Sequence, residues 1–191
     1  MRHFFIHILL LLSLGLPAQA APYFVQCYDF RCKTTKELHF EEAHWQQIRS
    51  LFADVGDSAA EKQAIRRAVA LMERISGELS GTHLDKGGNY PGSDIPRQMD
   101  CIDESTNTFQ YLLALQELGL LNWHSVDLKQ RRMVWFITHW TATIREIDSG
   151  RIYAVDSWYR DNGELPYLQP LPDWMRKREW SASLNPELAA N

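Results

Sequence analysis

Residues 100–119 read DCIDESTNTFQYLLALQELG, and this stretch predicts the helix around which the rest of the chain folds. Asp100 can cap the start of the helix, and Gly119 can end it as a left-handed residue after the last turn. Apolar side chains recur at helical spacing between these two residues. Cys101 therefore lies in the first turn, where the positive end of the helix macrodipole favours the thiolate form of a cysteine.

Two apolar, β-prone stretches follow the helix and contain a histidine and an aspartate. Residues 133–145 and 151–157 predict two strands joined through residues 147–150, with His139 in the first and Asp156 in the second. Side chains alternate along a strand, so the turn decides whether these two share a face. A two-residue turn puts them one diagonal step apart, and a four-residue turn puts them directly opposite. A three-residue loop would separate them.

Cys101, His139 and Asp156 are a nucleophile, a base and an orienting acid, in the order and on the elements that a thiol acyl-transfer site needs. Acidic residues in the first helical turn oppose the thiolate, so a cation such as protonated His139 is required beside it. The backbone N–H of Cys101 and one further donor would bind the oxyanion, and Gln98 is a candidate for that second donor. The alternative is that the three residues occupy core or surface positions in accidental order.

The first twenty residues predict a compartment. Arg2 opens a short basic start, residues 4–16 are an apolar stretch, and a small-x-small sequence ends at Ala20. The apolar stretch is shorter than the roughly 20 residues that span a bilayer. We therefore expect residues 1–20 to be a removable secretory signal and residues 21–191 to be a single periplasmic or secreted domain.

The three cysteines divide into a close pair and one remaining thiol. Cys27 and Cys32 flank a short segment that a tight hairpin could close as a disulfide in an oxidising compartment. The alternative is a pair of buried thiols. If the pair is bridged, Cys101 is left as a free thiol.

Composition and net charge limit the classes of function that the protein can have. The chain has 191 residues, 45% hydrophobic, and a formal net charge of −4 at pH 7, so it offers no basic footprint for nucleic acid. Four acidic residues could be suspected of binding calcium, but their spacing is not that of a known loop, and a solvated acidic rim is the preferred interpretation. These residues are Asp94, Asp100, Asp103 and Glu104. No cofactor and no metal site is predicted.

The segments before Cys101 predict helices and then a loop. Residues 41–52 form a short amphipathic helix, and Ser58 with Glu61 makes a capping box for a longer one that reaches Leu79. Residues 80–100 are rich in glycine and proline and predict a loop. The expected fold class is α+β, with amino-terminal helices and the thiol helix packed on an antiparallel sheet.

Residues 98–158 resemble the transglutaminase-like superfamily of papain-type thiol enzymes. The resemblance rests on a cysteine in the first turn of a helix that ends in Leu-Gly, on the His-Trp pair at residues 139–140, and on IYAVDS at residues 152–157. Residues 100–103, Asp-Cys-Ile-Asp, are similar to the Asp-Cys-x-Asp of bacterial transglutaminase-like cysteine proteinases, which are periplasmic. The whole chain also resembles an unassigned group of small secreted bacterial proteins.

The resemblance implies a transglutaminase/papain-like core with Cys101 as nucleophile, His139 as general base and Asp156 as orienter. Water as the second nucleophile would make the protein a cysteine peptidase or amidase of the cell envelope, and an amine would make it an acyltransferase. The expected partner is a protein, peptide or peptidoglycan-derived substrate, with no nucleic acid and no membrane span. The alternative is a non-catalytic envelope binding or scaffold protein that retains the fold.

Overall fold

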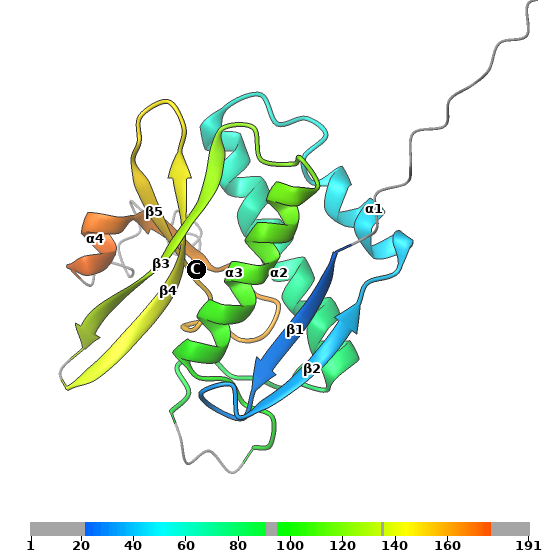
Figure 1. The fold of residues 1–191 in the computed structure, drawn as a ribbon, viewed down its shortest axis with the longest axis vertical. Coiled ribbons are helices and arrows are strands. Elements are labelled where there is room, and N and C mark those ends of the chain that lie inside the picture. Colours follow the sequence, from blue (N-terminus) through cyan, green and yellow to red (C-terminus); the bar gives the residue numbers. More distant parts are fainter. Residues whose placement is uncertain (1–21, 91–94, 135, 177–191) are drawn as a thin grey trace, which may run out of the picture.

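The computed structural model describes residues 22–90, 95–134 and 136–176, and Figure 1 shows how their elements are arranged. The predicted signal at residues 1–20 lies outside the described residues. The elements are, in chain order, β1 (Tyr23–Tyr28), β2 (Thr34–His39), α1 (Glu42–Ser50), α2 (Ser58–Ser80), α3 (Cys101–Glu117), β3 (His124–Val134), β4 (Ile137–Glu146), β5 (Ile152–Asp156), β6 (Tyr167–Pro170) and α4 (Leu171–Met175). The fold class is α+β, as the sequence predicts.

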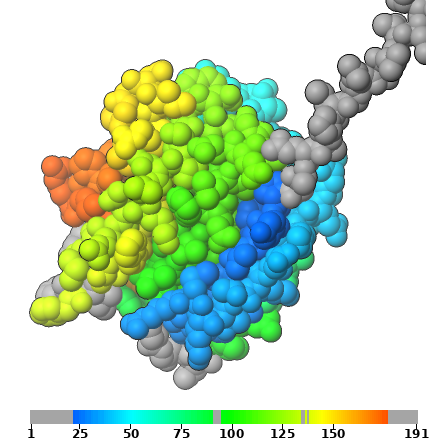
Figure 2. Space-filling model, in the orientation of Figure 1, coloured from blue at the N-terminus to red at the C-terminus, as the bar shows by residue number. Residues whose placement is uncertain are grey.

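Two antiparallel sheets lie on either side of α3 (Figure 1). Strands β1 and β2 form a hairpin, and strands β3 to β6 form a four-stranded sheet in sequence order. In the space-filling view one side of α3 reaches the surface between the blue hairpin and the yellow-green strands (Figure 2). The thiol helix therefore packs on an antiparallel sheet, as expected, with a second small sheet against its other side.

One strand boundary was predicted wrongly. Residues 133–145 do not form a single strand, because Met133 belongs to β3 and pairs with Thr138 across a tight reversal into β4. Residues 134–136 are Val-Trp-Phe and contain none of the glycine, proline, asparagine or aspartate residues that normally mark a turn, so no sequence signal indicated a break here. The first part of strand β3 was missed because residues 129–132 are four long polar side chains in a row.

Both ends of α3 confirm the sequence prediction. The Asp100 carboxylate accepts the backbone N–H groups of Ile102 and Asp103, at 2.9 and 3.1 Å, and the Asp103 carboxylate accepts the N–H of Asp100 at 3.2 Å. Gly119 follows the helix with φ at 68°, a left-handed conformation that glycine adopts without steric cost. Cys101 is thus fixed as the first helical residue.

The start of α2 is a correction. Asp57 caps this helix, and its carboxylate accepts the N–H of Ala60 at 2.7 Å. The predicted Ser58–Glu61 capping box does not form, because Glu61 is fully buried and its carboxylate binds the His124 ring at 2.6 Å. The same carboxylate also accepts the backbone N–H groups of residues 122 and 123, so both of its oxygens are engaged away from the start of the helix.

The core lies where α2, α3 and the large sheet meet. Its largest fully buried side chains include Trp45, Ile65, Met72, Tyr111, Leu112 and Ile144. Each such side chain contributes about 1.5–3 kcal/mol of burial free energy. This packing fixes α3 against β4 and so holds Cys101 near the sheet. No helix among the described residues is long and apolar enough to cross a lipid bilayer.

Candidate active site

Cys101 is the free cysteine of the chain and opens α3 at the edge of a cleft. Its side chain is largely buried, at 9% exposed, and Sγ lies 3.6 Å from the carbonyl oxygen of Thr138 on β4. The Cys101 N–H has no hydrogen-bond acceptor among the described residues, since Asp100 caps the two N–H groups that follow it. The first turn of α3 therefore presents both a thiol and a free amide donor.

His139 and Asp156 lie on the same face of the sheet and are hydrogen-bonded. The imidazole Nε2 donates to Asp156 Oδ2 at 2.7 Å, and both side chains are buried. Strands β4 and β5 pair Ala142 with Val155 and Arg145 with Ile152. This register puts Asp156 one diagonal step from His139, which is one of the two arrangements that the sequence left open. Residues 147–150 form the connecting loop.

The electrostatics of His139 favour its charged form. Burial lowers the pKa of His139, but the Asp156 carboxylate, and then the Cys101 thiol, raise it by more, to about 9. The second ring nitrogen, Nδ1, is buried and makes no hydrogen bond within the described part of the chain. An imidazolium beside a thiol is the arrangement that stabilises a thiolate, and Nδ1 is the nitrogen left to exchange a proton with Cys101.

Trp174 of α4 belongs to the site through a contact with Asp156 that the sequence did not predict. Its indole Nε1 donates to Asp156 Oδ2 at 2.7 Å, and its ring lies 5.6 Å from the His139 ring at an angle of 33°. The Arg132 guanidinium lies over the Trp174 ring, 4.3 Å from its centroid. The sequence signal was weak, because Trp174 is one of seven tryptophans and core packing is the default for each.

Two further aromatic residues, two and three positions after Asp156, enclose the imidazole. The Trp158 and Tyr159 rings lie 4.8 and 5.2 Å from the His139 ring. Trp158 is held in place by its Nε1, which donates to the carbonyl oxygen of Asn89 at 3.0 Å. These contacts exclude water from the ring and hold its orientation, which a catalytic imidazole needs.

An open cleft of about 540 Å³ lies over Cys101. Its walls combine aromatic side chains with one cation, and they include Arg31, Tyr90, Phe136, Trp140 and Trp158. A cleft of this volume has the size of sites that bind a small molecule or a few residues of a peptide. The thiol is therefore accessible from a groove that could hold an extended substrate.

The structure does not support Gln98 as the second oxyanion donor. Its amide Nε2 donates to the carbonyl of Leu84 at 3.0 Å, and its Oε1 accepts the N–H of Lys86 at 3.0 Å. Gln98 is 1% exposed and does not line the cleft. Its role is to tie down the loop before Tyr90. Gln98 was proposed because it lies close to Cys101 in the sequence. Closeness in the sequence does not say in which direction a side chain points.

The predicted solvated acidic rim is also wrong for the described residues. Asp100, Asp103 and Glu104 are buried, and Asp94 lies outside the described residues. Asp100 and Asp103 bind backbone N–H groups, whereas Glu104 faces two more buried carboxyl groups, Glu73 and Asp85. Burial raises the pKa of Glu73 to about 7 and of Asp85 to about 7, and raises that of Glu104 well above its usual value. This cluster lies inside the protein, behind the first turns of α3.

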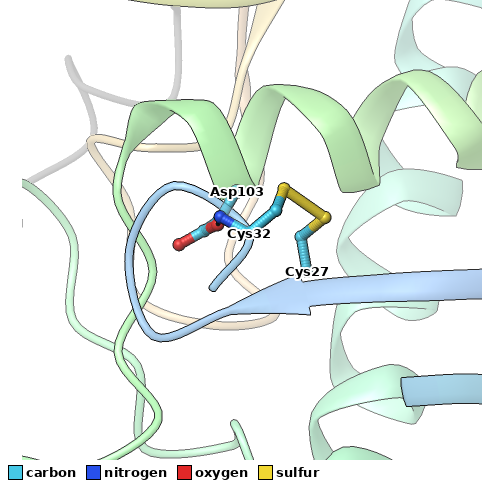
Figure 3. A group of neighbouring side chains, drawn as sticks. All are labelled: Cys27, Cys32 and Asp103. Atoms are coloured by element: carbon cyan, nitrogen blue, oxygen red, sulfur yellow. Dashed lines mark hydrogen bonds between the residues drawn. A yellow bond between two sulfur atoms is a disulfide. The ribbon is translucent and has the colours of Figure 1, made fainter. Parts of the chain in front are cut away.

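The predicted disulfide between Cys27 and Cys32 is present, and it closes a loop against the start of α3 (Figure 3). Residues 29–32 all have positive φ, between 52° and 64°. Each non-glycine residue in this conformation costs about 1 kcal/mol. The cost is offset by anchoring, because the Asp103 carboxylate accepts the N–H of Cys32 at 2.5 Å and Asp100 Oδ2 accepts the N–H of Arg31 at 3.2 Å.

Comparison with protein-family models, with curated proteins and with solved structures found no match to this chain. The chemistry of the site is therefore inferred from its own geometry.

Proposed function

We propose that the protein is a thiol-dependent amide hydrolase or acyltransferase with a transglutaminase-like, papain-type core. Cys101 is the nucleophile, His139 the general base and Asp156 the residue that orients it. The observation that carries the proposal is the buried His139 imidazole. Its Nε2 is hydrogen-bonded to Asp156, and its pKa is raised by Asp156 and then by Cys101, the free thiol of the chain. Perturbed titratable groups beside an open cleft are typical of catalytic sites.

The proposed reaction passes through a thioester. The Cys101 thiolate attacks the carbonyl carbon of an amide, and the resulting oxyanion accepts the N–H of Cys101. The His139 imidazolium gives its proton to the leaving nitrogen, and the carbon–nitrogen bond breaks to leave an acyl-thioester. Neutral His139 then takes a proton from water, or from an amine, as that molecule attacks the thioester. Asp156 keeps the ring in the tautomer that places Nδ1 toward the thiol.

The cell envelope is the proposed place of action. The disulfide at Cys27 and Cys32 is typical of an oxidising compartment, and residues 1–20 have the pattern of a secretory signal. Water is abundant there and a specific amine acceptor is not implied by the cleft, so hydrolysis is favoured over transfer. The substrate class is a peptide, a protein segment or a peptidoglycan-derived amide, lying along the cleft above Cys101.

Trapping the acyl-enzyme tests the proposal. The protein comprising residues 21–191 is mixed with p-nitrophenyl acetate at neutral pH, quenched in acid and mapped by peptide mass spectrometry. We expect one acetyl group on Cys101 in the wild type, none in Cys101→Ala, and much slower acylation in His139→Ala. Acetyl groups spread over lysines, or equal acylation of Cys101 in His139→Ala, would favour the scaffold alternative, in which the fold is retained without turnover.

A further inference from the structure

Arg31 places a cation at the mouth of the proposed active site. It lies on the loop closed by the Cys27–Cys32 disulfide, its side chain is exposed, and it lines the same cleft as Cys101. Within the described residues no acidic side chain forms an ion pair with its guanidinium. The basic groups of β3 near the cleft donate to neutral hydroxyl groups of the protein itself, Lys129 to Thr106 and Arg132 to Tyr159.

The backbone of Arg31 is held in place by hydrogen bonds and by the neighbouring disulfide, so the guanidinium is anchored beside the cleft. The N–H of Arg31 donates to Asp100 Oδ2, and that carboxylate also accepts the two N–H groups that begin α3. Asp100 is therefore engaged by backbone donors, while the Arg31 side chain extends over the cleft. The disulfide and the Asp103 contact hold the next residue, Cys32, in the same way (Figure 3).

The rest of the cleft lining is largely aromatic, and the Asp100 carboxylate, which also lines the cleft, is engaged by the backbone donors described above. Tyr90 packs edge-on against Trp158 at 5.1 Å, and Trp140 and Phe136 complete the apolar lining. A guanidinium above such a surface binds a carboxylate with two parallel hydrogen bonds, while the apolar part of the same molecule is removed from water by the rings. A neutral polar group would gain much less from Arg31.

We propose that the cleft selects amide substrates carrying a free carboxylate close to the scissile carbonyl, with Arg31 as the residue that binds this carboxylate. The inference rests on the proposed function, since it names the substrate class of the Cys101 site. It predicts a preference for acidic acyl groups, such as those with a side-chain or terminal carboxylate, over their neutral amide counterparts.

Two alkylating reagents of nearly equal size test the proposal without a known substrate. Iodoacetate and iodoacetamide both form a carbon–sulfur bond to Cys101 with loss of iodide, but only iodoacetate is an anion. The ratio of their rate constants, iodoacetate over iodoacetamide, is measured for the wild type and for Arg31→Gln. We expect the ratio to fall about fivefold in the variant, which is the Boltzmann factor for one ion pair a few ångströms apart in water.

Three controls isolate the effect of Arg31. Arg31→Lys keeps the charge and should keep most of the ratio. Arg67→Gln removes an exposed arginine of α2 that does not line the cleft, and it should leave the ratio unchanged. High salt should lower the wild-type ratio toward that of Arg31→Gln.

An unchanged ratio in Arg31→Gln, or an equal fall in Arg67→Gln, overturns the proposal. The failure of the proposed function is a separate result. It appears as iodoacetamide labelling that His139→Ala does not alter, and the ratio for Arg31 can still be read in that case.

Discussion

The imidazole of His139 is 2% exposed, and desolvation alone would leave a histidine at that depth neutral. Burial lowers the pKa of His139, but the hydrogen-bonded Asp156 carboxylate, and then the Cys101 thiol, raise it by more. The resulting pKa of His139 is about 9. Acyl transfer that needs the imidazolium to protonate the leaving nitrogen should therefore decline as the pH rises through about 9.

Trp174 supports the same carboxylate, so its indole N–H can be tested separately from its ring. In Trp174→Phe the aromatic packing on His139 is largely kept, but the hydrogen bond to Asp156 Oδ2 is lost. We expect a loss of about 2 kcal/mol in the free energy of unfolding, the usual worth of a hydrogen bond to a buried charge, and slower acylation of Cys101. Urea unfolding and acyl-enzyme trapping measure the two effects.

Trp123→Phe is the control for that variant, because Trp123 directly precedes β3, at the opposite end of this strand from Arg132. Equal losses in both tryptophan variants would show that the effect is general packing and not support of Asp156.

The loop of residues 29–32 and the start of α3 stabilise each other. The double variant Cys27→Ser with Cys32→Ser removes the disulfide and releases four residues held at positive φ. We expect it to lower the free energy of unfolding by about 2 kcal/mol, as for a bridge that closes a short loop. A reductant should bring the wild type to the stability of the double variant and leave the variant unchanged. A variant as stable as the wild type would mean that the strained loop holds without its bridge.

The ends of α3 and the pairing of His139 with Asp156 could be predicted because both depend on local rules. Asp100 and Gly119 have side-chain and backbone preferences that act within a few residues, and alternation along a strand fixes a face once the register is given. Contacts between distant segments leave no such local signature. Trp174 and Gln98 are the clearest examples, since only the folded chain decides what a side chain of either type will contact.

The buried carboxyl groups behind α3 make the stability of the whole protein depend on pH. Glu73 and Asp85 have pKa values raised by burial to about 7, and that of Glu104 is raised well above its usual value. In the unfolded chain these groups ionise near pH 4, so between about pH 4 and 7 the folded state binds more protons. Stability should therefore fall as the pH rises through this window.

The raised pKa of His139 acts in the same direction between about pH 6.5 and 9, because the folded state retains a proton that the unfolded state loses. The lowered pKa of Glu146, whose carboxylate accepts hydrogen bonds from Ser149 and Ser58, opposes the trend only below about pH 4.5. The midpoint of urea unfolding should thus be higher at about pH 5.5 than at about pH 8. A midpoint that rises with pH across this interval would contradict the burial of the cluster.

Glu104→Gln tests the contribution of one member of that cluster. The amide has the shape of the carboxyl group but cannot ionise, so we expect stability at about pH 8 to rise by about 1–2 kcal/mol and stability at about pH 5 to change little. Glu117→Gln, on the exposed end of the same helix, is the control and should leave the pH dependence as it is. Equal effects of the two variants would remove the cluster as the cause.

In the proposed mechanism His139 activates Cys101, and the pH profile of Cys101 alkylation by iodoacetamide measures this activation. The wild type should react fast at neutral pH, and His139→Ala should shift the profile toward that of an unassisted thiol, near about pH 8.5. Asp156→Asn should produce a smaller shift in the same direction, since the ring remains but loses the carboxylate that holds its charge. Superimposable profiles for the three proteins, each like that of an ordinary exposed thiol, would contradict the claim.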